Sequence, residues 1–225
     1  FFSPPFLLYP IDIFKGSVKL KESPKKELGG EEKRMEIRNI EDMREIIEKE
    51  PWEIVSEHGG NIENILRNFG CINRNGSVNL DPILAFPNLR KIISAMLGAK
   101  IEIEIKNKLN QKIDMVVSSS YSALLAEALS DKINTACAFT QNVNQVQKWT
   151  KRFRIPPSAH VLQVEGVVFS LDIVRQVKEA VLEKNPGVKF VKDNGKTIIA
   201  AVVSLIPEKP QDYKILALMG TRPHR

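Results

Sequence analysis

The segment at residues 158–184, with the sequence SAHVLQVEGVVFSLDIVRQVKEAVLEK, constrains the fold of this chain more than any other. Residues 160–168 are rich in Val and Leu, which predicts a strand that is covered on both faces. Residues 173–181 repeat Ile, Val and Ala at helical spacing, which predicts an amphipathic helix. Asn185-Pro186-Gly187 then ends the helix. A buried strand, a short turn and a helix in this order are typical of α/β proteins.

The turn between this strand and this helix is a candidate anion site. α/β proteins hold phosphates at such a turn, because the first N–H groups of the helix are unpaired and its dipole favours an anion. Ser170 and Asp172 are the candidate phosphate-binding residues of this turn. Asp172 is also the expected N-cap of the helix, and Ser170 is an expected cap within the loop. Glu165, in the strand, is either a solvated carboxylate at the strand end or a ligand-binding group, and the sequence leaves both open.

The same alternation of strands and helices continues on both sides of this segment. Further buried strands are predicted at residues 113–117, 134–140 and 197–205, with a helix beginning near Tyr121 and a polar turn at residues 141–147. We therefore predict the α/β class, with a mainly parallel sheet flanked by helices.

The N-terminal part of the chain departs from this pattern. Residues 1–34 join a proline-broken apolar segment to a Lys/Glu-rich run, so we expect a disordered extension there. Since the first methionine is Met35, we expect this part to be an upstream extension or a translated leader. Residues 35–70 predict N-terminal helices that form a hood, interrupted near Gly59-Gly60, and residues 71–225 form the α/β domain.

Part of the chain resembles the type I phosphoribosyltransferases, most closely the orotate enzymes. The family's phosphoribosyl-diphosphate (PRPP) signature is a hydrophobic strand, two adjacent acids, and a Thr-Thr-Gly-Gly type loop that opens a helix. Val161-Leu162-Gln163-Val164 matches the strand and Glu165 the first acid. Gly166 stands at the second acid and Phe169-Ser170-Leu171-Asp172 at the phosphate loop. The resemblance covers residues 73–206 by order and spacing, and it implies the family's fold with a degenerate PRPP motif.

The resemblance also implies functional residues elsewhere. The loop after the strand predicted at residues 113–117 corresponds to the family's diphosphate-binding loop. Its hydroxyl and N–H groups could hold an anion, or the serines could serve only as ordinary helix caps. The residues concerned are Ser118, Ser119, Ser120, Tyr121 and Ser122. Lys148 is the nearest match to the basic residue of the family's flexible loop, so Lys148 and Glu165 are the catalytic candidates. Magnesium is the implied cofactor of an active enzyme; without activity we expect none, and no protein-held metal.

The sequence leaves three functional hypotheses, two of which depend on the altered residues. Gly166 lacks the second acid, while Phe169, Leu171 and Asp172 bring bulk and negative charge to the place where a phosphate must approach. The first hypothesis is a phosphoribosyltransferase-like protein that binds a nucleotide or another anion and acts in regulation. The alternative is an active, divergent orotate-type phosphoribosyltransferase of pyrimidine biosynthesis, a pentosyltransferase that makes a nucleotide and diphosphate. An unrelated doubly wound domain is a third possibility.

Composition limits the partners. The net charge is +6, but Lys and Glu are interspersed without a continuous basic face, so we expect a small anionic ligand and no nucleic acid. No apolar run reaches the ~18 residues that a membrane span needs. Cys71 and Cys137 have no motif spacing, which suits thiols in a reducing cytoplasm, and the three histidines predict no zinc site. The family resemblance implies a homodimer.

Overall fold

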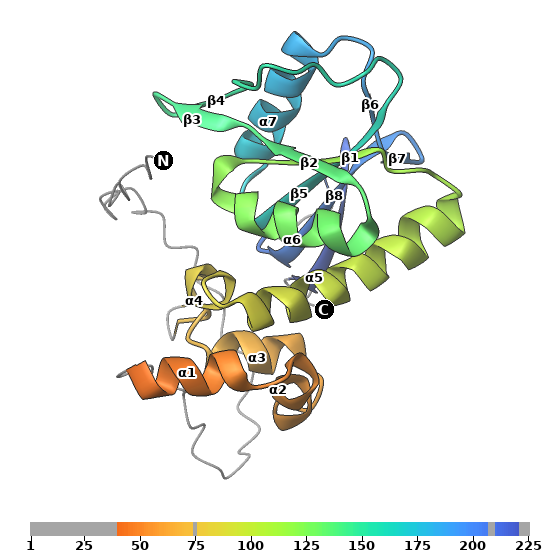
Figure 1. Ribbon diagram of the computed structural model, residues 1–225. Coiled ribbons are helices and arrows are strands. Elements are labelled where there is room, and N and C mark those ends of the chain that lie inside the picture. Colours follow the sequence, from red (N-terminus) through yellow and green to blue (C-terminus); the bar gives the residue numbers. More distant parts are fainter. Residues whose placement is uncertain (1–39, 74–75, 207–209, 221–225) are drawn as a thin grey trace.

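A mainly parallel sheet forms the centre of the molecule (Figure 1). The computed structural model describes residues 40–73, 76–206 and 210–220, so the expected extension at residues 1–34 lies outside them. The long strands run parallel in the order β2-β1-β5-β8-β9. They are β1 (Met115–Ser118), β2 (Ala136–Phe139), β5 (His160–Val168), β8 (Lys196–Ser204) and β9 (Tyr213–Gly220). The predicted fold class is confirmed.

β5 occupies the middle of the sheet because both of its faces are apolar. Val161 packs into one core cluster with Val177 and Val181, whereas Leu162 and Val164 belong to the cluster on the opposite face. Short strands β6 (Lys189–Phe190) and β7 (Lys192–Asp193) pair with the starts of β5 and β8, and only β7 runs antiparallel. The strand predicted at residues 160–168 is confirmed over its whole length.

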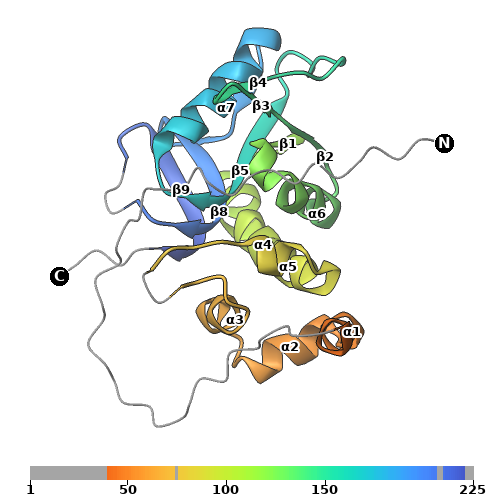
Figure 2. The ribbon, with the colours of Figure 1, turned by 90° about the vertical axis from the view of Figure 1, so that its left-hand side faces the viewer.

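Helices cover both faces of the sheet (Figure 2). α5 (Pro87–Ile101) and α6 (Ala123–Ile133) lie on one face, and α7 (Leu171–Lys184) lies on the other. α5 continues as a π-helical segment, η1 (Glu102–Asn107). Among the described residues, no helix is both long and apolar enough to cross a membrane.

Three helices precede the sheet; the first two pack against α5 and the third packs against β9. They are α1 (Ile40–Glu48), α2 (Pro51–Glu57) and α3 (Ile62–Asn68), and the short α4 (Asp81–Leu84) follows them. Gly59 and Gly60 separate α2 from α3 with positive φ angles of 62° and 69°, as the sequence predicts. Ile46, Ile54 and Ile65 are buried in the same core cluster as α5, so this hood and the sheet share one hydrophobic core.

A β-hairpin follows β2, where the sequence predicts a simple polar turn. β3 (Gln141–Val143) pairs antiparallel with β4 (Val146–Lys148). Asn144 and Gln145 between them have φ angles of 52° and 66°, as a two-residue type I′ turn requires. The prediction was wrong because Asn-Gln is not the Asn-Gly pair that favours this turn.

Gln145→Gly is expected to stabilise the protein by about 0.5–1 kcal/mol. Gln145 adopts a left-handed conformation at φ 66°, which is strained by about 1–2 kcal/mol for a residue with a Cβ. Glycine relieves this strain, but its greater conformational freedom in the unfolded chain offsets about half of the free energy recovered. Chemical denaturation measures the difference. Asn144→Gly is the matched control and should gain less, because asparagine tolerates this conformation; an equal gain from both would contradict the argument.

Candidate functional site

Two turns meet at the carboxyl edge of the sheet. β1 ends at Ser118 and leads through the 3₁₀ turn η2 (Ser120–Ser122) into α6. β5 is the parallel neighbour of β1, with Val117 opposite Gln163. The serine-rich turn after β1 therefore lies beside Glu165 of β5, and the two segments that the resemblance assigns to diphosphate and ribose come together.

Glu165 is buried in this turn. Only 3% of the residue is exposed. Its Oε1 accepts hydrogen bonds from Ser119 N (3.1 Å) and Gln163 Nε2 (3.1 Å), and its Oε2 accepts from Ser119 Oγ (2.6 Å) and Ser122 Oγ (2.7 Å). The sequence left open whether Glu165 is a solvated carboxylate at the strand end. The structure excludes this possibility, because Glu165 is buried and accepts hydrogen bonds from four donors.

Ser122 connects the turn to the next residue of β5. Its Oγ accepts a hydrogen bond from Gly166 N (2.9 Å) while it donates to Glu165. Ser118 turns away and donates to the carbonyl of Ser119 (3.0 Å). Ser120 is half-buried, and Tyr121 is 60% exposed. Of the five residues predicted here, only Ser119 and Ser122 contact Glu165.

Burial dominates the electrostatics of this cluster. Desolvation raises the pKa of Glu165 above its ordinary value of 4.5, although the hydrogen bonds from Ser119, Ser122 and Gln163 favour the ionised form. Gln163 is also buried, and its Oε1 has no hydrogen-bond partner in the described structure. Sequence reasoning gave Gln163 no role at the site. Its polar side chain two residues before Glu165, and hence on the same strand face, was the available signal.

The place of the second acid is occupied by a hydrophobic side chain. A Cβ added to Gly166 would lie 3.2 Å from Leu80 Cδ1 and 3.8 Å from Ser122 Oγ. Leu80 directly precedes α4, and 5% of it is exposed. No local sequence signal connects Leu80 to Gly166, because only the tertiary structure brings the two segments into contact.

The loop between β5 and α7 caps its own helix. The hydroxyl of Ser170 accepts a hydrogen bond from Asp172 N (3.3 Å), so Ser170 is the N-cap and the prediction that Asp172 takes this position was wrong. Asp172 lies in the first turn and forms a 3.5 Å ion pair with Arg175. Its carboxylate therefore faces the positive end of the helix dipole, where a bound phosphate would also lie.

Lys148 belongs to the hairpin and makes no hydrogen bond or ion pair with Glu165 in the described parts of the chain. Together with Lys184, it lowers the pKa of Glu183 on α7. Gln147 N donates to Gln176 Oε1 of α7 (3.1 Å), and Asn142 Nδ2 donates to Tyr121 Oη (2.5 Å). The segment that corresponds to the family's flexible loop is thus an ordered hairpin tied to α7 and to the serine turn.

The residues at the site do not fit a protein-held magnesium ion. Within the described ranges, no group of three or more His, Cys, Asp and Glu side chains is close enough to bind a metal. Both oxygens of Glu165 face N–H and hydroxyl donors, whereas Mg²⁺ requires oxygen ligands in octahedral geometry.

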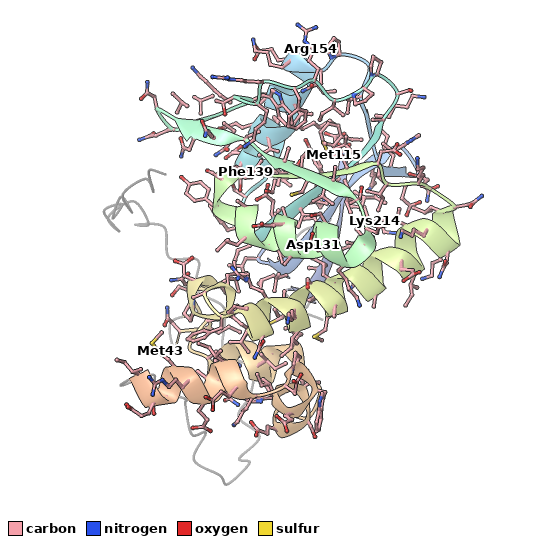
Figure 3. The ribbon with its side chains drawn as sticks, viewed as in Figure 1. Met43, Met115, Asp131, Phe139, Arg154 and Lys214 are labelled. Atoms are coloured by element: carbon pink, nitrogen blue, oxygen red, sulfur yellow. The ribbon has the colours of Figure 1, made fainter. Side chains whose placement is uncertain are left out.

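An open groove of about 660 Å³ lies between α5 and α6. Its lining includes Asp131, which Figure 3 labels, and Arg90, but neither Glu165 nor Ser119–Ser122.

Comparison with known proteins identifies this fold. No protein-family model matches the sequence, and no curated protein matches it. The structure of Leishmania donovani UMP synthase matches with a TM-score of 0.50 and 12% identity, over 75% of this chain and 36% of that chain. The chain is also similar to orotate phosphoribosyltransferase from Aeropyrum pernix, with a TM-score of 0.48 and 10% identity, over 71% of this chain and 93% of that chain. Adenine phosphoribosyltransferase from Trypanosoma brucei, in complex with AMP, pyrophosphate and ribose-5-phosphate, matches with a TM-score of 0.45 and 11% identity, over 67% of this chain and 74% of that chain. The match to UMP synthase shows that this chain shares the fold of the matched part of that protein.

Proposed function

We propose that this chain is a phosphoribosyltransferase-fold protein that has lost ordinary PRPP transfer and serves as a nucleotide- or anion-binding regulatory protein. One observation carries the proposal: the buried carboxylate of Glu165 takes the N–H of Ser119 and the hydroxyls of Ser119 and Ser122. In the resembled enzymes, the corresponding turn holds the departing diphosphate.

A diphosphate in this turn would have to compete with Glu165 for the same donors. Two like charges ~4 Å apart repel by several kcal/mol at the effective dielectric of a protein surface. A loss of ~3 kcal/mol already lowers affinity more than a hundredfold. The internal carboxylate therefore excludes a second strong anion from the turn while Glu165 is ionised.

The other contacts that PRPP needs are weakened as well. Leu80 covers the position of the second acid, so the ribose hydroxyls would have one carboxylate fewer. Phe169 and Leu171 stand where the phosphate loop of the family has small residues, and Asp172 adds a negative charge at the start of α7. The favoured ligand is consequently a small anion held outside the serine turn.

The alternative function is that of an active, orotate-type phosphoribosyltransferase. It would use PRPP with its own magnesium, Glu165 at the ribose and Lys148 in the moving loop. Lys148 would then have to leave its place near Glu183, and the serine turn would have to release Glu165. Assembly as a homodimer and a cytoplasmic location remain predictions under both functions.

We expect the native protein to bind PRPP weakly or not at all, even with magnesium. Gly166→Asp alone should not restore binding, since the new side chain would meet Leu80. Replacing Phe169-Ser170-Leu171-Asp172 by Thr-Thr-Gly-Gly together with Gly166→Asp and Leu80→Ala should give measurable but still weak binding, because glycine exposes N–H groups to the 5′-phosphate while Glu165 still occupies the serine turn. Isothermal titration calorimetry with PRPP and magnesium measures each affinity.

The control is the loop exchange without Gly166→Asp and Leu80→Ala, which should bind more weakly than the complete variant. Circular dichroism establishes that each variant is folded. Tight, magnesium-dependent binding of PRPP by the native protein, followed by turnover with orotate, would overturn the proposal and favour the active enzyme.

A further inference from the structure

The connection from β4 to β5 gathers most of the molecule's excess positive charge. Residues 132–164 contain five Lys or Arg and no Asp or Glu, within a chain whose net charge is +6. Four of the five lie at Lys148, Lys151, Arg152 and Arg154, interleaved with Trp149 and Phe153. We call residues 148–157 the basic strap.

Beyond Lys148, the last residue of β4, the basic strap has no regular secondary structure, yet it is anchored at both ends. Trp149 is 7% exposed and Ile155 is 2% exposed. Ile155 N donates a 2.7 Å hydrogen bond to Asn185 Oδ1 at the end of α7, and Trp149 Nε1 donates to Phe153 O at 3.4 Å. The side chains between these anchors are consequently held at the surface in a defined arrangement.

The exposed part of the strap combines an aromatic ring with unpaired cations. Phe153 is 47% exposed, and its ring contacts Trp149 edge-on with a centroid distance of 5.7 Å. Arg152 and Arg154 on either side are exposed, and neither forms an ion pair within the described residues. Lys151 Nζ lies 3.6 Å from the centroid of the Phe139 ring. Figure 3 labels Phe139, which Lys151 contacts, and Arg154.

The hairpin beside the strap adds neutral hydrogen-bonding groups. β4 leads directly into the strap, and the exposed amides of the hairpin are Gln141, Asn142, Asn144 and Gln145. Glu183 on α7, on which Lys148 acts electrostatically, is paired with Lys184 at 2.7 Å. The face therefore offers cations, an aromatic ring and amides, with little negative charge.

We propose that the basic strap and the β3–β4 hairpin bind single-stranded nucleic acid. Arg152, Arg154 and Lys151 neutralise phosphates, an unstacked base packs on Phe153, and the hairpin amides reach base edges. An acidic peptide would use the cations but not the exposed ring, and a duplex would keep its bases away from that ring. The Lys/Glu mixture of the whole chain predicted no such surface; the acid-free run is visible in the sequence, and the fold adds the anchors that hold it at the surface. The proposal does not depend on Glu165.

The test is fluorescence anisotropy with labelled single-stranded DNA and RNA of about a dozen nucleotides, titrated with the full chain over a series of salt concentrations. Arg152→Gln with Arg154→Gln should weaken binding at least tenfold and reduce the slope of log affinity against log salt by about 1.4. Phe153→Ala should weaken binding about tenfold with an unchanged slope, and Phe153→Trp should restore it, because stacking does not involve counterions.

The matched control is Arg44→Gln with Lys91→Gln, which removes the same charge from exposed positions on α1 and α5. Its affinity for the oligonucleotides should stay within about twofold of that of the native protein, because charges far from the basic strap are screened by salt. An equal loss in the control, an unaffected Phe153→Ala variant, or equal affinity for duplex or polyglutamate would each overturn the proposal. Arg152→Gln with Arg154→Gln and Phe153→Ala leave the Glu165 cluster and residues 169–172 unchanged, so their PRPP titrations should match that of the native protein, and this result is separable from that on PRPP.

Discussion

Ser122→Ala is expected to destabilise the protein by about 2–4 kcal/mol near neutral pH, because it removes the acceptor of the buried Gly166 N–H and one of the four donors to the buried carboxylate of Glu165. Ser122 Oγ donates to Glu165 at 2.7 Å and accepts from Gly166 N at 2.9 Å. Alanine can neither donate nor accept these hydrogen bonds. Ser122 is itself buried, so the place of its hydroxyl oxygen is closed off from solvent. Urea denaturation of both proteins measures the difference in the free energy of unfolding.

The effect of Ser122→Ala should depend on pH. Since the pKa of Glu165 is raised in the folded state, the folded protein binds more protons than the unfolded chain just above the ordinary value of 4.5. The contribution of Glu165 to stability is therefore present below that value and is lost as the pH rises through the raised pKa. Removing a donor raises this pKa further, so the loss from Ser122→Ala should be smaller at about pH 4 than at about pH 8.

Ser120→Ala is the matched control, since Ser120 is half-buried in the same turn and its hydroxyl makes no hydrogen bond to another described residue. It should change stability by less than about 0.5 kcal/mol at either pH. A cost of Ser122→Ala that is the same at both pH values would show that Ser122 does not stabilise an ionised Glu165.

Asn185→Ala is expected to destabilise the protein by about 2–3 kcal/mol, because one buried amide joins the basic strap to α7. Asn185 is 1% exposed; its Oδ1 accepts from Ile155 N at 2.7 Å, and its Nδ2 donates to Val181 O at 2.8 Å. Alanine would leave the N–H of Ile155 buried without an acceptor. Thermal unfolding of the variant measures the loss.

Asn107→Ala serves as the control, because Asn107 is exposed at the end of η1 and makes no hydrogen bond through its side chain to any described residue. It should change stability by less than about 0.5 kcal/mol. Asn185→Asp should fall between the native protein and Asn185→Ala, since it keeps the acceptor for Ile155 N but loses the donor to Val181 O. An Asn185→Ala variant as stable as the control would mean that the strap is held by apolar burial alone.

The sequence by itself determined the elements whose signals are local and periodic. The run of Val and Leu in residues 160–168 and the helical spacing that follows it specified β5 and α7, because a strand or helix buries its own apolar residues wherever it is placed. The order of strands and helices then fixed the α/β class. The substitutions at Gly166 and at residues 169–172 were equally visible in the sequence, since a motif is a matter of neighbouring residues.

The tertiary structure alone decided what these residues touch. Ser119 and Glu165 are separated by 46 positions, and only the parallel pairing of β1 with β5 makes the serines the partners of the carboxylate. Leu80 over Gly166 has no local pattern at all. The hairpin depends on two left-handed residues that lack the usual glycine, and the acid-free face of the strap depends on anchors at Trp149 and Ile155. Each is a contact between segments distant in sequence or a strained conformation held by its surroundings, and neither leaves a periodic signal.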